Sequence, residues 1–251
     1  MQFQHRRRFR PFRRPGHLLK RGRMALLGKA VVAIWNDITP EGRSNFIEWH
    51  NRQHIPERVG IPGFHRGRRY IAEHGAPEYF TLYEAVDETV LSGPGYLQRL
   101  NNPTDWTREA TSAFRNTERG VCGIVHSIGS GDGGYMLTAR FDAEAGERTT
   151  LQKHLVERLG AIERLPWISG AHLCIADTAA SGIETAERKG RQVSVPNWIV
   201  MIEGSSASMV ETAASELIEG DLVANGMKGA SQRGLYRLEY SLAEFEGPGI
   251  G

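Results

Sequence analysis

Two tandem α+β units are the fold that this sequence predicts, and three observations lead to it. Apolar β-branched or aromatic runs alternate with amphipathic segments in the order strand, helix, strand, strand, helix, strand. That order, the ferredoxin-like split βαβ arrangement, occurs twice. A glycine-rich stretch separates the two occurrences, as expected of a linker. We therefore expect a basic tail at residues 1–23, a first unit at 24–129, a linker at 130–134 and a second unit at 135–245.

The first unit opens with an apolar, β-branched strand over residues 29–35. Thr39 is a favourable N-cap and Pro40 suits the first position of the helix that follows. Pro56 lacks an amide hydrogen and disfavours helical backbone at the residue before it, so we expect this helix to end or kink just past His54. The remaining elements follow from alternation and from Gly and Pro breaks: strands over 64–72, 79–85 and 120–128, and helices over 90–100 and up to 116.

The second unit repeats this order with weaker sequence similarity. An ungapped offset of 104 residues places Pro62 on Pro166 and His50 on His154, but His54 on Arg158. The second half therefore keeps the scaffold without the histidine-rich helix. Its elements are expected as strands over 135–141, 166–175, 197–203 and 234–242, helices over 147–162 and 208–218, and an irregular polar insertion over 177–195.

The charge of the chain is unevenly distributed. The formal net charge is +2, but nine of the 31 Lys and Arg residues precede Met24, and no acidic residue occurs before Asp37. Residues 24–251 hold 22 basic and 29 acidic residues, so the body is mildly acidic, which argues against a nucleic-acid partner.

The basic tail at residues 1–23 leaves several interpretations open. Translation starting at Met24, with an upstream extension or a disordered arm before it, is the simplest. A targeting segment would be expected to contain serine and an amphipathic helix, and the stretch has no serine. No apolar run approaches the length of a membrane span. The two cysteines, Cys122 and Cys174, lie in apolar runs and indicate buried thiols in a reducing compartment, so a cytoplasmic protein is expected.

The segment from Phe46 to Phe64 concentrates the usable chemistry of the chain. Phe46, Trp49 and His50 share a helix face by their spacing of three and four residues. His54 precedes Pro56 and could act as a general acid or base at the edge of an apolar pocket, or could instead cap the broken helix end.

This segment resembles the dimeric α+β barrel superfamily, especially EthD-like and related uncharacterised proteins. The resemblance rests on His54-Ile55-Pro56 at a helix end and on Pro62-Gly63-Phe64 leading into a strand. It implies that two ferredoxin-like units form an α+β barrel and that His54 lines a pocket between sheet and helices. It also implies activity on hydrophobic, often aromatic, small molecules, and it leaves a homodimer possible.

Metal and haem sites receive less support. His50 and His54 have the spacing of a helical metal-binding pair, but the glutamate of a His-Glu-x-x-His motif is missing and Arg52 would repel a cation. A helix histidine ligates haem in related barrels, and His54 or His154 could serve here, yet the sequence shows no anchor for the propionates. We expect no metal and no cofactor.

Four further residues complete the expected site. Arg68 and Tyr70 share one face of their strand and could stabilise developing oxyanion charge, or could form ion pairs between sheets. Tyr83 could contribute to an apolar wall, and Trp106 could cover the pocket or pack a loop on the core.

The sequence thus predicts a cofactor-independent lyase, isomerase or cyclase that acts on a hydrophobic, aromatic small molecule. His54, Arg68 and Tyr70 are its expected catalytic residues. The expected substrate-binding residues are Phe46, Trp49, His50, Tyr83 and Trp106. Two alternatives remain open: a non-catalytic ligand-binding or scaffolding barrel, and a haem-dependent or cofactor-free monooxygenase.

Overall fold

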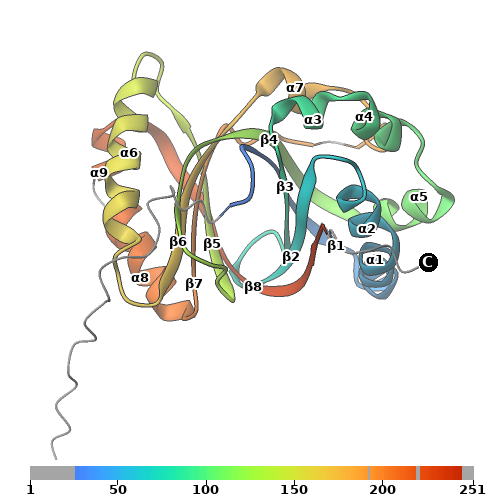
Figure 1. Cartoon of the computed structure of the whole chain (residues 1–251), viewed down its shortest axis with the longest axis horizontal. Helices are drawn as coiled ribbons and strands as arrows, with labels where there is room; N and C mark the ends of the chain where they lie inside the picture. Colours follow the sequence, from blue (N-terminus) through green and yellow to red (C-terminus); the bar gives the residue numbers. More distant parts are fainter. Residues whose placement is uncertain (1–25, 192, 219–220, 245–251) are drawn as a thin grey trace, which may run out of the picture.

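The chain folds into a closed β-barrel with helices outside it, as shown by a computed structural model that describes residues 26–191, 193–218 and 221–244 (Figure 1). The tail predicted at residues 1–23 lies outside these described residues. The strands are β1 Ala30–Ile38, β2 Phe64–Gly75, β3 Tyr79–Ala85, β4 Phe114–Gly129, β5 Tyr135–Ala143, β6 Ile168–Ala176, β7 Trp198–Gly204 and β8 Met227–Ala243.

The helices of the first half follow β1 and β3, and those of the second half follow β5, β6 and β7. A 3₁₀ turn at Pro40–Gly42 and a π-helical turn at His50–His54 interrupt the regular pattern. The α-helices are α1 Arg43–Trp49, α2 Ile55–Val59, α3 Glu88–Ser92, α4 Pro94–Asn101, α5 Asp105–Ser112, α6 Arg148–Ile162, α7 Thr178–Gly182, α8 Ala207–Ile218 and α9 Asp221–Ala224.

The strand order confirms two ferredoxin-like units within one α+β barrel. In the first half the order is β4-β1-β3-β2, and in the second half the equivalent strands follow as β8-β5-β7-β6. Antiparallel pairing of β2 with β8 and of β4 with β6 joins the two halves and closes the barrel. A single chain therefore supplies both units of the barrel.

Alternate side chains along each strand separate the barrel interior from the helix-covered surfaces. The interior is filled by a cluster that we call the barrel core, in which Trp35 stacks on Phe80 with 4.8 Å between ring centroids. Tyr70 and Tyr236 pack against the same Phe80 ring. The barrel core is thus a packed interior to which both halves contribute.

The helices α1 to α5 cover the outer face of the first sheet, and α6, α8 and α9 cover that of the second, at opposite ends of the molecule in Figure 1. The short helix α7 of the second half lies instead on the side of the first half. In the second half, α6 and α8 bury an aliphatic core that includes Leu151, Leu155, Leu159 and Leu217. In the first half, the helices bury aromatic and histidine side chains, described below.

Barrel closure explains where strand ends differ from the sequence prediction. The last strand was expected over 234–242, but β8 begins at Met227 because its polar first part pairs with β5. The helix expected to reach residue 116 ends at Ser112, since Phe114 already pairs with Ile38 of β1. Hydrogen bonds between strands stabilise these polar segments, and a hydrophobic pattern cannot reveal them.

The helices in the described ranges are all too short or too polar to cross a membrane. Within the same ranges, no group of three or more His, Cys, Asp or Glu side chains is arranged to hold a metal ion.

Candidate functional site

The helix that carries the histidines was expected to end or kink just past His54, and it does not end there. The helix continues through Pro56 to Val59, and the residues before Pro56 form a π-helical turn at His50–His54. Within this turn the amide of Ile55 donates to the carbonyl of His50, five residues earlier. The wider turn accommodates the missing amide of Pro56 without stopping the helix.

The π-helical turn inserts one residue relative to α6 of the second half. Phe46, His50 and Ile55 are the buried positions that face the first sheet, at spacings of four and five residues. On α6 the buried positions are Leu151, Leu155 and Leu159, at a regular spacing of four. By burial, His50 therefore corresponds to Leu155, and the ungapped offset of 104 that paired it with His154 fails here by one residue.

We call Phe46, Trp49, His50, His54 and Tyr83 the histidine cluster, because their rings pack in one buried group. The ring centroids of Trp49 and His54 are 4.2 Å apart, and those of Phe46 and His50 are 4.9 Å apart. The two imidazoles lie 5.4 Å from each other, and Tyr83 meets His54 edge-on at 6.2 Å. Five of the predicted site residues are thus brought together.

Hydrogen bonds assign a tautomer to His50. The guanidinium of Arg69 lies 3.5 Å from Nδ1 of His50, and the hydroxyl of Tyr83 lies 3.3 Å from Nε2. Because a guanidinium can only donate, Nδ1 accepts, and the proton of the neutral ring is on Nε2, where it can be donated to Tyr83. Arg69 is itself held by Asn51 and Glu239.

Both imidazoles are neutral near pH 7. Burial, followed by the positive charges of Arg69 and Arg58, lowers the pKa of His50 well below its ordinary value. Burial and then the charges of Arg58, His50 and Arg191 lower the pKa of His54 in the same way. Nδ1 of His54 is buried without a hydrogen-bond partner among the described residues.

The phenol of Tyr83 is also held in its neutral form, since burial raises its pKa. The cluster therefore combines two neutral bases and a neutral hydroxyl within an aromatic surrounding. Such groups can transfer protons but carry no fixed charge of their own.

Trp106 lies on α5, at the side that faces α1. Its indole N–H donates to Asn45 at 2.7 Å, and its ring packs against the cluster that contains Phe46 and Ala110. On α5, Thr107 accepts the indole N–H of Trp49 at 3.2 Å. These contacts hold α1 against α5, so Trp106 supports the helix that carries the histidines.

Arg68 and Tyr70 lie on the other side of the sheet from His54, although all three were expected in one site. Tyr70 belongs to the barrel core, and the guanidinium of Arg68 lies 5.7 Å from its ring centroid. Strand alternation places Gly67 and Arg69 on the helix side, where a Cβ at Gly67 would meet Ile55 and Tyr83. The structure therefore does not bring the expected oxyanion-stabilising pair to the expected base.

Arg68 belongs instead to a buried charge network at one end of the barrel. It contacts Glu84 at 2.9 Å and Glu203 at 3.1 Å, and His172 contacts Glu203 at 3.0 Å. The hydrogen bond of His172 and the charge of Arg68 lower the pKa of Glu203 to about 2, against the opposing effect of its burial. This network ties β2 and β3 of one half to β6 and β7 of the other.

Sequence reasoning missed three residues near His54. Arg58, one helical turn beyond His54, is buried and pairs with Glu187 at 2.6 Å. Arg191 lies with its guanidinium carbon 5.3 Å from the Phe114 ring centroid, and its charge acts on His54. The spacing of His54 and Arg58 could have indicated the first contact, but nothing in the polar insertion indicates that Glu187 and Arg191 reach the first half.

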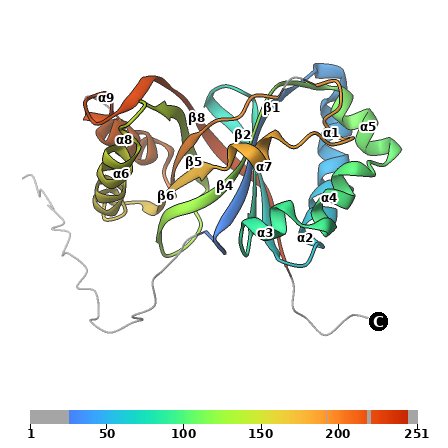
Figure 2. The same ribbon diagram turned by 90° about the horizontal axis from the view of Figure 1, so that it is seen from above.

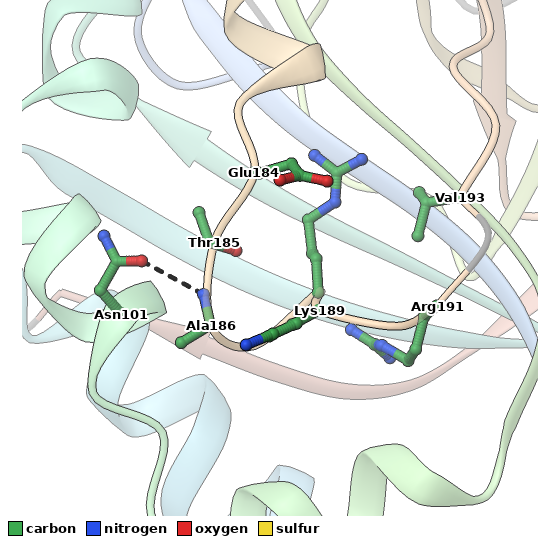
Figure 3. A pocket seen from close by; sticks show the side chains of 8 residues that line it. Asn101, Glu184, Thr185, Ala186, Lys189, Arg191 and Val193 are labelled. Atoms are coloured by element: carbon green, nitrogen blue, oxygen red, sulfur yellow. Dashed lines mark hydrogen bonds between the residues drawn. The ribbon is translucent and has the colours of Figure 1, made fainter.

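A cavity of about 380 Å³ lies beside these residues, between the insertion and α4 (Figure 3). Its volume is in the range of small-molecule sites. His54 is not one of its lining residues, which are Asn101, Glu184, Thr185, Ala186, Arg188, Lys189, Arg191 and Val193.

No protein-family model and no curated protein matches the sequence. Among solved structures, the chain is similar to an "anthrone oxidase-like protein", with a TM-score of 0.60, 11% identity, and coverage of 85% of this chain and 92% of that one. It is also similar to a "putative monooxygenase" from Fusobacterium nucleatum subsp. nucleatum, with a TM-score of 0.56, 7% identity, and coverage of 86% and 95%.

A "putative monooxygenase" from Lactobacillus acidophilus gives a TM-score of 0.55 at 8% identity, with coverage of 86% of this chain and 96% of that one. At such low identity the likeness concerns the fold alone. The chain thus shares the two-unit α+β barrel fold of these proteins.

Proposed function

We propose that this protein is a cofactor-independent enzyme that transfers a proton on a hydrophobic, aromatic small molecule, with His54 as the general base and then the general acid. One observation carries the proposal. The neutral imidazole of His54 packs against the indole of Trp49, with a buried Nδ1 that has no hydrogen-bond partner among the described residues. The resemblance of this helix to EthD-like proteins supports the same role.

In the proposed reaction, Nδ1 of His54 removes a proton from an acidic C–H or O–H of the substrate. Burial and the neighbouring cations disfavour the imidazolium that results, so the proton is readily returned to another atom of the substrate. Removal and return of one proton suits an isomerase, lyase or cyclase. Trp49 and Phe46 surround the imidazoles with aromatic rings.

A cofactor-free monooxygenase is the second candidate, favoured by the names of the structural neighbours. The same proton removal would leave an electron-rich substrate anion that reacts with molecular oxygen. Oxygen uptake in the presence of a phenolic substrate distinguishes the two reactions. A haem enzyme would instead show a strong visible absorption band in the purified protein.

Untargeted metabolite turnover tests the proposed base. The His54→Ala variant should lose activity by about 10²- to 10⁴-fold, the usual contribution of general acid–base catalysis. Arg158→Ala changes the counterpart position on α6, where the side chain bonds to the carbonyl of Glu216, and should retain activity. Thermal unfolding of both variants shows whether they are folded. Full turnover in folded His54→Ala would exclude His54 as the base, and absence of any turnover in wild type would favour a non-catalytic barrel.

A further inference from the structure

The insertion of the second half forms part of the surface of the first half. We call residues 177–191 the strap. It begins at α7 and crosses toward α4 and α5, as the orange segment in Figure 2 shows. The amide of Glu187 donates to the carbonyl of Leu100 at 3.0 Å, and the amide of Ala186 donates to the side chain of Asn101 at 3.2 Å (Figure 3). These bonds fix the strap on α4.

The cavity between the strap and α4 is positively charged. Its lining includes three basic side chains, Arg188, Lys189 and Arg191, and one acidic side chain, Glu184. Burial lowers the pKa of both Arg188 and Arg191, and repulsion by Arg119 adds to this effect, whereas the charge of Glu187 opposes it at Arg191. An anion entering the cavity would relieve this repulsion.

Buried donors without acceptors lie in or next to this cavity: Thr185 and Arg191 line it, and Arg58, which does not line it, pairs with Glu187 of the strap. Nη1 of Arg58, Nε and Nη1 of Arg191 and Oγ of Thr185 all lack a hydrogen-bond partner among the described residues. Arg58 and Thr185 are only 2% and 6% exposed, so bulk water cannot solvate them freely. Unsatisfied buried donors are rare in folded proteins and costly, particularly when they are charged.

The guanidinium groups are oriented so that their edges remain available. Aromatic rings contact both groups, with Arg58 5.8 Å from the centroid of Tyr96 and Arg191 5.3 Å from that of Phe114. Glu187 occupies one nitrogen of Arg58 and acts by its charge on Arg191. The lining of the cavity adds a further excess of positive charge, so the whole region favours an anion.

We propose that Arg58 and Arg191 bind a carboxylate of an aromatic small molecule beneath the strap. The planar, forked donors of arginine match the two oxygens of a carboxylate. This inference rests on the proposed function in one respect, which is that the bound molecule is the substrate on which His54 acts. The strap therefore completes in the second half a site whose other parts lie in the first.

Carboxylate binding would also change the base. The charges of Arg58 and Arg191 contribute to the low pKa of His54. A carboxylate between them offsets those charges and raises the pKa of His54 toward its ordinary value. The imidazole thus becomes a stronger base when substrate is present, and a weaker one in its absence.

Calorimetric titration of the full chain with benzoate, and with benzamide as a neutral probe of the same shape, tests the proposal. Benzoate should bind more tightly than benzamide, and Arg191→Gln should weaken benzoate binding about tenfold or more, as expected for loss of charged hydrogen bonds. Arg191→Lys keeps the positive charge but not the forked donors, so its affinity for benzoate should lie between those of wild type and Arg191→Gln. Arg148→Gln is the matched control, because Arg148 lies over Trp198 in the second half.

Equal binding of benzoate and benzamide, no binding of benzoate, or equal weakening in Arg148→Gln would each overturn the carboxylate site. Thermal unfolding identifies any variant that fails to fold, and Arg191→Lys then supplies the comparison. His54→Ala separates this inference from the proposed function. If His54→Ala has unchanged turnover while wild type binds benzoate through Arg191, the carboxylate site stands and the role of His54 fails.

Discussion

The two halves of the barrel have the same strand order but bury different side chains beneath their helices. Beneath α6 and α8 the second half has an aliphatic core, with Leu155 fully buried. At the corresponding place the first half has the histidine cluster, with His50 and His54 on a π-helical turn. The strand order therefore does not depend on the chemistry of the helix-side core, and one half can carry a polar site while the other carries packing.

The side chains inside the barrel are more alike in the two halves than those beneath the helices. Glu84 and Glu203 are each the sixth residue of their strands, β3 and β7, and both are fully buried. Arg68 and His172, which are 104 residues apart in the sequence, face them from β2 and β6. Because these four side chains contact one another across the junction of the halves, a change in one affects the others. The helix sides lack that constraint.

The largest expected difference between the halves is in the cost of exchanging the counterpart residues His50 and Leu155. Leu155→His removes an apolar side chain and buries an imidazole in an aliphatic core, so we expect a loss of about 4 kcal/mol in the free energy of unfolding. His50→Leu ends the burial of a polar ring but leaves the buried hydroxyl of Tyr83 without its hydrogen bond, so we expect a smaller loss of about 1–2 kcal/mol. Urea denaturation measures both values. Equal losses would show that the two cores are equivalent.

The second-largest expected effect is on the pH dependence of stability, to which the buried histidines of the first half contribute. The pKa values of His50 and His54 are lowered in the folded state, so below about pH 6.5 the unfolded chain binds protons that the folded chain does not. The free energy of unfolding should therefore decrease as the pH is lowered below about 6.5. The decrease should be about 1.4 kcal/mol per pH unit for each histidine, until the pH reaches the lowered pKa values.

Urea titrations between pH 6.5 and pH 5 should show this slope in wild type and a reduced slope in His54→Asn. His74 provides the opposite control, because its contact with Glu211 raises its pKa. The His74→Asn variant should lose a small stabilisation that is present below about pH 6.5 and disappears as the pH rises through the raised pKa, so its slope below about pH 6.5 should match that of wild type. An unchanged slope in His54→Asn would mean that His54 is charged or accessible in the folded protein.

The smallest expected effect concerns the turn before the second strand of each half. Gly63 in the first half has a φ of 94°, and its counterpart Trp167 in the second has a φ of 69°, which is unfavourable for a residue with a Cβ. Trp167 is 65% exposed and so contributes little packing. We expect Trp167→Gly to stabilise the protein by up to about 1 kcal/mol in thermal unfolding.

The reverse substitution should have the opposite sign. A Cβ at Gly63 would lie 2.7 Å from a methyl group of Val90, so Gly63→Ala should destabilise the protein. Destabilisation by Trp167→Gly would instead indicate that the exposed indole makes a contact that stabilises the fold.

The sequence was sufficient for the element order and for the part of the site that is local in sequence. Phe46, Trp49, His50 and His54 occur within nine residues, so helical spacing alone brings them together. Strand alternation correctly placed Arg68 and Tyr70 on one face and Arg69 on the other. Which face the barrel encloses depends on closure between the halves, and the sequence pattern of one strand does not contain that information.

Long-range contacts account for what could not be predicted. Arg58 meets Glu187 across 129 residues of sequence, and the polar strap has no periodicity that would indicate where it packs. The π-helical turn was also unexpected. Proline inside a helical pattern usually indicates that the helix ends or kinks, unless a wider turn accommodates its missing amide. Both features add to the site, and neither is visible in the hydrophobic pattern of the sequence.

We expect small molecules to bind at the first half of the barrel and not at the second. The indole N–H signals of a ¹⁵N-labelled protein test it directly, because Trp49 lies in the histidine cluster and Trp198 in the aliphatic core. On titration with benzoate, the signal of Trp49 should shift to saturation while that of Trp198 stays in place. A shift of Trp198 without one of Trp49 would contradict the account.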